Sequence, residues 1–432
     1  MIESSGSKLG FWSIFFLGIN SIIGSGIFLL PNKAYADVGM GSLVVILINT
    51  LLALFLALCF AEAASIFEKN GSAFVYAREA FGNLAGFEIG MFAWFIGVIT
   101  WAAEIQGFLT ALSGIHPIAV DPLYNRIFVI IIGLTLGILN YLGVKFSKIL
   151  NNTITIAKLV PLFLFILLGI VFVNLSNFTP LIPKITEGLS TGKLGVATLV
   201  IFYAFTGFDL LAVAAEDMEN PTKNLPKILI IVILFCSIFY LGIMATCIDL
   251  LGNRLASTPI PIADATEVVL GKSGFLFVTI ATLISIGGIT IALSFIAPRS
   301  IQALAEHKYL PKIFKEKGRY DTAWFSILIS TLLATALALY GNFIFLAGLT
   351  VVARLIEFIS TAGSIIVFRK RKLKALYKMP FGIVIPIIAI ILSVWLLSES
   401  SLEKIMFIII ALIVGYLFYI FYAKKSLEKN EE

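Results

Sequence analysis

The stretch Ile22-Ile23-Gly24-Ser25-Gly26-Ile27 lies in the middle of the first long apolar segment, which runs from Leu9 to Pro31. That segment is long enough for a membrane-spanning helix, which needs about 20 apolar residues, yet each glycine costs about 1 kcal/mol relative to alanine. Unwound backbone at mid-membrane depth is tolerated only where protein buries it or where it lines a polar cavity. The stretch therefore predicts either a broken helix at a binding site or close packing of helices through small residues.

The composition places the whole chain in a membrane. Hydrophobic residues make up 59% of the 432 residues and charged residues 13%, with a mean hydropathy of +1.03, whereas a soluble domain is about a quarter charged. The three cysteines lie inside apolar segments, and the two histidines lie far apart in predicted loops. These positions argue against a disulfide framework and a metal cluster. We expect no metal, no cofactor and no enzymatic activity.

Twelve apolar segments predict twelve membrane spans. They cover residues 9–32, 42–67, 84–112, 125–142, 148–175, 194–217, 226–251, 274–298, 323–341, 343–368, 380–398 and 402–423. We do not expect the first segment to be a cleaved signal peptide, because it stays apolar beyond its small residues and further spans follow it.

Lysine and arginine are distributed unequally between the two sides of these spans. With the N-terminus inside, the inside segments and the C-terminal tail hold 22 of them and the outside loops hold 7. This asymmetry predicts cytoplasmic termini in the cell (cytoplasmic) membrane. The basic run Arg369-Lys370-Arg371-Lys372 is then a helix end near anionic lipid rather than a nucleic-acid site. The mixed segment 70–82 predicts a short surface helix with Phe74, Ala77 and Phe81 on one face.

The sixth span carries a second interruption, Tyr203-Ala204-Phe205-Thr206-Gly207-Phe208-Asp209. It lies about a dozen residues into its span, ~18 Å deep and near the middle of a ~30 Å hydrocarbon core. Interrupted segments at corresponding positions of two halves are the best sequence pointer to a transporter site. Residues 9–175 and 194–368 would then be inverted repeats, because five spans reverse the second copy. Residues 380–423 would be peripheral, within one domain covering the whole chain.

Three ordered motifs resemble the amino acid–polyamine–organocation (APC) superfamily of permeases. They are Gly24-Ser25-Gly26-Ile27-Phe28-Leu29-Leu30-Pro31, Tyr76 with Arg78-Glu79-Ala80-Phe81-Gly82, and Asn220-Pro221 with Asn224-Leu225-Pro226. The resemblance covers essentially the whole chain. It implies an all-α membrane protein of twelve transmembrane helices with a five-plus-five inverted repeat (LeuT-like fold), broken helices 1 and 6 and two peripheral helices. It also implies transport by alternating access.

In that superfamily the first break holds the carboxylate of an amino acid on backbone amides. By resemblance, these amides here belong to Ile22, Ile23, Gly24, Ser25 and Gly26. Amides exposed at a helix break favour an anion, so the physical argument agrees.

The superfamily's second break takes the α-ammonium group on carbonyl oxygens, which here belong to Tyr203, Ala204 and Phe205, beside Gly207 and Asp209. Tyr203 also resembles the aromatic gate that covers bound substrate. Ordinary packing is the alternative for Tyr203 and Phe205.

Ionisable residues within the spans are candidates for coupling. An acid at the depth of Asp209 costs about 2.5–3.5 kcal/mol on insertion, so it is usually functional or paired. We expect it to contact substrate or handle protons, with a structural partner as the alternative. Some members of the superfamily carry a lysine at the place of Lys158, where sodium-coupled relatives hold a cation. This implies sodium independence, whether Lys158 couples protons or only contacts free carbonyls of the first break.

Arg354, Glu357 and Glu104 also lie within the spans. Arg354 and Glu357 are three apart on one helical face, which favours a structural ion pair over a gate. For Glu104 the sequence favours no role.

We therefore expect a sodium-independent transporter of neutral or a broad range of amino acids, by proton symport or exchange. The predicted pocket looks apolar, with Tyr203, Phe205, Phe208, Ile289 and Leu293. Cationic amino acids or amines are the next candidate substrates, favoured if Asp209 is ionised. A non-transporting amino acid sensor on the same scaffold is an alternative, against which the short predicted tails argue. Expected partners are the substrate, protons and the bilayer, with monomer and homodimer both open.

Overall fold

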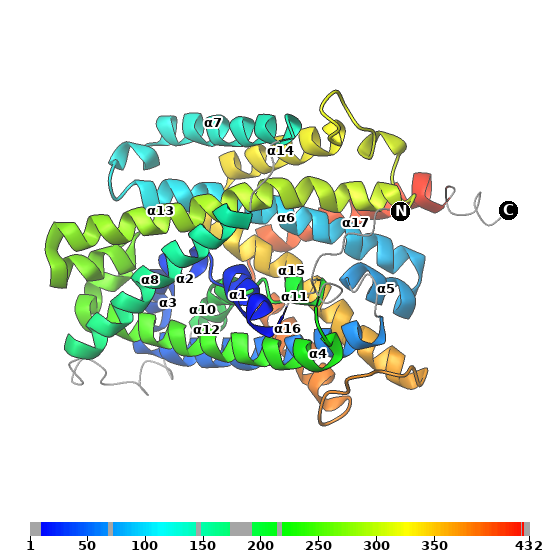
Figure 1. Ribbon diagram of the computed structural model, residues 1–432, viewed down its shortest axis with the longest axis horizontal. Coiled ribbons are helices and arrows are strands. Elements are labelled where there is room, and N and C mark those ends of the chain that lie inside the picture. The colour runs from blue at the N-terminus through cyan, green and yellow to red at the C-terminus, as the bar shows by residue number, and fades with distance from the viewer. Residues whose placement is uncertain are drawn as a thin grey trace.

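The computed structural model describes residues 10–67, 72–143, 148–172, 192–213 and 218–424, together with residue 426. This part of the chain is mainly helical, and it includes an isolated β-bridge between Lys317 and Ala323. Within it, eight helices are long and apolar enough to cross a membrane, and four shorter apolar helices accompany them. The long helices lie side by side along the longest axis of the molecule (Figure 1). The chain is therefore a multi-pass, all-α membrane protein.

The helices follow the predicted apolar segments. The first part of the chain forms α1 (Phe11–Ile22), α2 (Ser25–Leu29), α3 (Pro31–Val38), α4 (Ser42–Ile66), α5 (Ala73–Phe81), α6 (Asn83–Leu112), α7 (Pro122–Tyr141) and α8 (Lys148–Phe172). The rest forms α10 (Lys193–Phe202), α11 (Asp209–Val213), α12 (Pro221–Leu251), α13 (Pro261–Glu306), α14 (Trp324–Tyr340), α15 (Phe343–Lys370), α16 (Val384–Ser398) and α17 (Leu402–Phe418), with short 3₁₀ turns that include η4 (Tyr203–Phe205) and η6 (Gly252–Ala256). The predicted ends of the fifth and sixth spans, residues 173–175 and 214–217, lie outside the described residues.

The first predicted interruption breaks its helix. α1 ends at Ile22, and the next two residues leave the helical conformation: Ile23 has φ −74° and ψ 97°, and Gly24 has φ −122° and ψ −160°. α2 then begins at Ser25. The broken-helix interpretation of this stretch is confirmed.

The second interruption also breaks its helix. α10 ends at Phe202 and tightens into η4, after which Thr206 is extended with φ −72° and ψ 157°. Gly207 follows with φ +107°, a conformation that residues with a side chain rarely adopt. α11 then starts at Asp209.

The helices that surround the two breaks pack through small residues. α6 contacts α13 and α15 extensively, and α4 contacts α12. α7 and α14 lie against each other at one edge (Figure 1). A Cβ atom on Gly133 of α7 would lie 2.3 Å from Thr335 Oγ1, and one on Gly137 would lie 2.7 Å from Thr331 Oγ1. Glycine thus permits the close helix approach that is typical of membrane interiors.

α5 confirms the predicted short helix, but its buried face differs from the predicted one. Tyr76 is fully buried, whereas Phe81 is 49% exposed. The reason is that α5 packs between α6 and α15, where Ser364 donates a hydrogen bond to the Tyr76 carbonyl oxygen. Arg371 holds the end of the helix by donating to the carbonyl oxygen of Glu79 at 2.6 Å.

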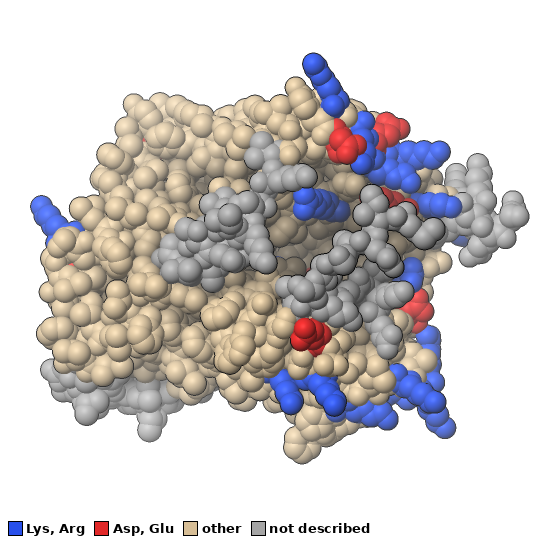
Figure 2. Space-filling model, in the orientation of Figure 1, with Lys and Arg blue, Asp and Glu red and all other residues tan. Residues whose placement is uncertain are grey.

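Charge gathers at the end of the molecule that carries α5. Most lysine and arginine side chains visible in Figure 2 lie there, whereas the described surface farther from this end is mostly tan, that is, uncharged. The contact between Arg371 and α5 brings the basic run 369–372 to this end.

Candidate functional site

The two helix breaks face each other in direct contact. A Cβ atom on Gly26 would lie 2.9 Å from both Cα and Cβ of Ala204, in the second break. A Cβ atom on Gly207 would lie only 2.2 Å from the carbonyl oxygen of Ser21, at the end of α1. Both approaches require glycine, because real Cβ atoms essentially never come within 3.0 Å of such neighbours. The glycines of the two interruptions therefore serve to bring the unwound segments together.

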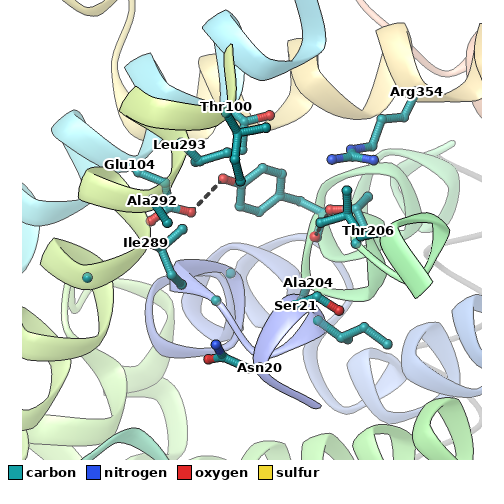
Figure 3. Close-up of a pocket in the computed structure, with 18 of the residues that line it drawn as sticks. Asn20, Ser21, Thr100, Glu104, Ala204, Thr206, Ile289, Ala292, Leu293 and Arg354 are labelled. Carbon is teal, nitrogen blue, oxygen red and sulfur yellow. Dashed lines mark hydrogen bonds between the residues drawn. The ribbon is translucent and has the colours of Figure 1, made fainter. Parts of the chain in front are cut away.

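A cavity of about 220 Å³ opens where the breaks meet. Figure 3 shows labelled side chains converging on it from several helices, with Glu104 and Ile289 opposite Arg354 and Thr206. Its lining comes from α1, the two breaks, α6, α11, α13 and α15: Leu17, Asn20, Ser21, Ile22, Gly24, Gly26, Thr100, Glu104, Tyr203, Ala204, Thr206, Gly207, Leu210, Gly288, Ile289, Ala292, Leu293, Ile296 and Arg354.

Some of the residues predicted to form the binding site line the cavity, and others do not. Those that line it are Ile22, Gly24, Gly26, Tyr203, Ala204 and Gly207. Those buried outside its lining are Ile23, Ser25, Lys158, Phe205 and Asp209. Of the expected apolar residues, Ile289 and Leu293 line the cavity, whereas Phe208 is fully buried away from it.

Glu104 of α6 links the two breaks. Its Oε1 accepts a hydrogen bond from the hydroxyl of Ser25 at 2.7 Å and another from the hydroxyl of Tyr203 at 2.8 Å, the dashed line in Figure 3. Its Oε2 is buried and has no hydrogen-bond partner within the described part of the chain. The side chain is 2% exposed and lines the cavity. Sequence reasoning left this residue without a role.

Lys158 of α8 reaches the first break from behind. Its buried ammonium group donates to the carbonyl oxygens of Asn20 at 2.8 Å and Ile23 at 2.7 Å. The break removes Ile23 from the helical conformation, so its carbonyl needs another donor. The lysine thus supplies hydrogen-bond donors at the carbonyl end of the unwound segment.

Tyr240 of α12 ties the two breaks together, and the sequence analysis missed it. Its hydroxyl lies 2.8 Å from the carbonyl oxygen of Ala204 and 3.3 Å from that of Ile22, and the side chain is fully buried. The ring of Phe205 packs edge-on against the ring of Tyr240, with 5.2 Å between the ring centroids, and this contact agrees with the packing alternative for Phe205. A tyrosine in the middle of an apolar span was the available signal, since its hydroxyl must find a partner there.

Arg354 pairs with Asp209 rather than with Glu357. Its Nη1 donates to both carboxylate oxygens of Asp209 at 2.9 Å, and both residues are buried. The predicted Arg354–Glu357 pair was therefore wrong, because helical spacing identifies neighbours on one helix only. The second break starts α11 at Asp209, which brings that carboxylate to α15. Arg354 lines the cavity, and Asp209 lies behind it.

One wall of the cavity is apolar. It is formed by α13 and the exposed sides of α1 and α11, with Leu17, Leu210, Ile289, Ala292, Leu293 and Ile296. Over the residues that the structure describes, no group of three or more potential metal ligands occurs. The arrangement is suited to a small molecule with polar ends and an apolar body.

Sequence comparisons place the chain among known transporters. A family model described as amino acid permease matches residues 9–422. The branched-chain amino acid permease of Bacillus subtilis is 31% identical and covers 98% of this chain and 94% of its own length. From the same organism, a serine/threonine exchanger is 27% identical over 96% of each chain, and a methylthioribose transporter is 27% identical over 98% of this chain and 95% of its own. The chain belongs to the amino acid permease family, within the APC superfamily that its motifs resemble.

Proposed function

We propose that this protein is a secondary transporter that carries amino acids across the cytoplasmic membrane by alternating access. The observation that carries the proposal is the cavity between two helix breaks that face each other. At each break the backbone leaves the helical conformation. Relatives named as permeases and exchangers of amino acids support the substrate class. A transported zwitterion would lie between the breaks.

The first break would hold the carboxylate of the substrate. Only the amides of Gly24, Ser25 and Gly26 leave the regular helical ladder there, and Gly24 and Gly26 line the cavity. Neither glycine has a side chain of its own that would keep a carboxylate away from its backbone. Ser25 lies behind the lining and would contribute only through its backbone. Ile22 still belongs to α1 and the amide of Ile23 donates to the carbonyl oxygen of Ile19 at 2.9 Å, so the prediction that these two amides hold the carboxylate was wrong.

The second break would hold the ammonium group. Carbonyl oxygens of Tyr203, Ala204 and Phe205 are the candidate acceptors, and Gly207 supplies the turn that keeps them facing the first break. Tyr203 lines the cavity and would also act as the aromatic gate. Its hydrogen bond to Glu104 would have to be kept or exchanged whenever this gate moved.

Transport would be independent of sodium. The ammonium group of Lys158 occupies the carbonyl oxygens that a metal cation would otherwise need. Asp209 would act in coupling through its ion pair with Arg354, which borders the cavity, rather than by touching substrate.

The proposal includes the full topology. Ten of the twelve spans would form two inverted repeats, 9–175 and 194–368, and the last two, within 380–423, would lie at the periphery. The proposal applies to a monomer and to a homodimer alike. Eight long and four shorter apolar helices in the described part support this count. The basic end in Figure 2 supports cytoplasmic termini, because lysine and arginine favour the cytoplasmic side.

The apolar wall of the cavity favours neutral amino acids with aliphatic side chains. Ile289, Leu293 and Ile296 would pack against such a side chain, and the branched-chain permease relative agrees. Cationic amino acids or amines are the second candidate, because Glu104 lines the same cavity. A non-transporting sensor would bind the same ligands without moving them.

Purified protein in proteoliposomes tests the proposal. Labelled L-leucine should accumulate, compete with other neutral amino acids and respond to a pH gradient or to internal leucine, with no effect of a sodium gradient. L-lysine tests the second candidate in the same assay. Binding of amino acids without flux under any gradient or exchange condition would favour the sensor. Absence of both binding and flux would refute the proposal.

A further inference from the structure

We propose that Glu357 of α15 binds a proton beside the ion pair of Asp209 and Arg354, and that this proton keeps the second break in the position that binds substrate. The inference rests on the proposed function, because it names a residue that couples protons to transport. We call Asp209, Arg354 and Glu357 the charge cluster. It lies where α11 begins, against α15, and of its three members Arg354 lines the cavity.

The charge cluster contains two acids and one base. Nη1 of Arg354 donates to both carboxylate oxygens of Asp209 at 2.9 Å. Glu357 lies three positions further along α15, is buried, and has neither a hydrogen bond nor an ion pair within the described part of the chain. With both acids ionised, the cluster would hold a negative charge without a counter-charge, which is costly in a buried site. One bound proton removes this charge.

The proton belongs on Glu357 rather than on Asp209. Asp209 accepts two hydrogen bonds from a guanidinium group, an interaction that favours an ionised carboxylate. Next to Glu357 in the chain, Phe358 packs against the rings of Phe60 and Phe208, with 5.6 and 5.2 Å between the ring centroids. Apolar rings offer no hydrogen bond to a charged carboxyl group. A neutral Glu357 therefore fits these surroundings.

The basic residues that pack near α15 do not supply the missing positive charge. Arg369, near the end of the same helix, donates two hydrogen bonds to Glu62 of α4. Arg78 of α5 pairs with Glu79 at the surface. The helices α10, α16 and α17 carry no charged residue beyond their first turns. Among these helices, the positive charge beside the two acids is therefore that of Arg354.

The acidic and phenolic groups on the other helices packed against α15 are separate from the cluster. Glu104 of α6 accepts the hydroxyl of Tyr203 of η4. Glu88 of α6 faces α17, where a Cβ atom on Gly415 would lie 2.5 Å from its Oε2. Tyr76 of α5 is buried with an uncharged hydroxyl. Within the described part of the chain, none of these groups forms a hydrogen bond or an ion pair with the cluster.

The position of Asp209 links the proton to the second break. Asp209 is the first residue of α11, directly after that break, and its ion pair with Arg354 fixes the start of α11 against α15. An ionised Glu357 would attract the same guanidinium group and weaken its hold on Asp209. A protonated Glu357 leaves the guanidinium group to Asp209 and so keeps the second break at the cavity.

Proton exchange at Glu357 forms and breaks only an O–H bond. Water on the side to which the cavity is open supplies the proton before substrate binds and receives it after substrate leaves. Because substrate binds to the protonated cluster, each amino acid is carried together with one proton, which is symport. Leucine affinity then falls as the pH rises, because the cluster with an ionised Glu357 does not hold the break in place.

Infrared spectra of the purified full-length protein test the proton directly. A protonated carboxylic acid has a C=O stretch that an ionised carboxylate lacks. At neutral pH this absorption should be weaker in Glu357→Gln than in the wild type by the contribution of a single carboxyl group. Asp209→Asn should show the same loss, because a cluster of one acid and one base is neutral without a proton. Glu79→Gln, at an exposed glutamate, is the matched control and should absorb as the wild type does.

Calorimetry of L-leucine binding tests the coupling. Above the pH at which Glu357 ionises, the affinity of the wild type should fall about tenfold per pH unit. Glu357→Gln is permanently neutral, so its affinity should stay constant across that range, whereas Glu79→Gln should follow the wild type.

Equal carboxylic acid absorption in the wild type and Glu357→Gln would overturn the inference, and so would the same pH dependence of leucine affinity in both. If Glu357→Gln does not fold, Asp209→Asn decides, since unchanged absorption in that variant contradicts the charge balance of the cluster. A wild type that binds no amino acid would instead refute the proposed function, and the infrared comparison would still show whether Glu357 holds a proton.

Discussion

Replacing Gly207 by alanine should disable the site without unfolding the protein. Two effects combine at this position. The residue has φ +107°, a conformation that costs about 1–3 kcal/mol for a residue with a side chain. The new methyl group would also lie 2.2 Å from the carbonyl oxygen of Ser21, so one break must move by roughly 1 Å to restore ordinary contact. A displacement of that size can lower a rate about 100-fold.

The assay for Gly207→Ala is the initial rate of L-leucine uptake in proteoliposomes, normalised to the protein that elutes as a single folded species. Gly252→Ala is the matched control, since Gly252 has φ +51° but no atom within 4 Å of an added Cβ. Both variants carry the backbone strain, and only Gly207→Ala also forces the breaks apart. We expect uptake to fall about 100-fold in Gly207→Ala and to stay close to wild type in Gly252→Ala. Equal rates in the two variants would refute the facing-break geometry.

Three further substitutions test the contacts around the breaks. Lys158→Ala leaves two buried carbonyl oxygens without their donor, about 1–3 kcal/mol each, and should abolish or uncouple leucine uptake; unchanged, pH-insensitive flux would contradict its role. Tyr240→Phe should weaken leucine binding about tenfold, because it removes the hydroxyl that holds Ala204 of the second break and Ile22 of the first break in place. Tyr416→Phe, at an exposed position, should bind as the wild type does. Arg354→Gln alone should lower stability by about 3–5 kcal/mol by leaving Asp209 buried and unpaired. Adding Asp209→Asn to this variant should restore part of the lost stability, measured by thermal unfolding. Stability losses that simply add in the double variant would argue against the ion pair.

Local sequence predicted the two breaks because their cause is local. Glycines at Gly24, Gly26 and Gly207 weaken a helix wherever it lies, and their mid-span positions are visible from hydropathy alone. The approximate positions of the helices followed for the same reason, but some bounds did not: α13 covers Pro261–Glu306, whereas the apolar run predicted 274–298. The short helix at 73–81 was also predictable from its mixed composition.

The partners of the breaks were not predictable, because they come from helices far away in the chain. Tyr240 and Glu104 are polar residues within apolar spans, and nothing in their neighbourhood says which surface they face. The pairing of Arg354 with Asp209 spans 145 residues, whereas sequence spacing favoured Glu357 three positions away. The burial of Tyr76 instead of Phe81 likewise depends on where α6 and α15 pass.

The central claim is that two unwound segments hold an amino acid between them. The most direct test is a cryo-electron microscopy structure of the protein with L-leucine bound. The claim predicts the leucine carboxylate within hydrogen-bonding distance of the amides at Gly24–Gly26 and its ammonium group at the carbonyl oxygens of Tyr203–Phe205. Continuous helices at both positions, or leucine bound elsewhere with this cavity empty, would contradict it.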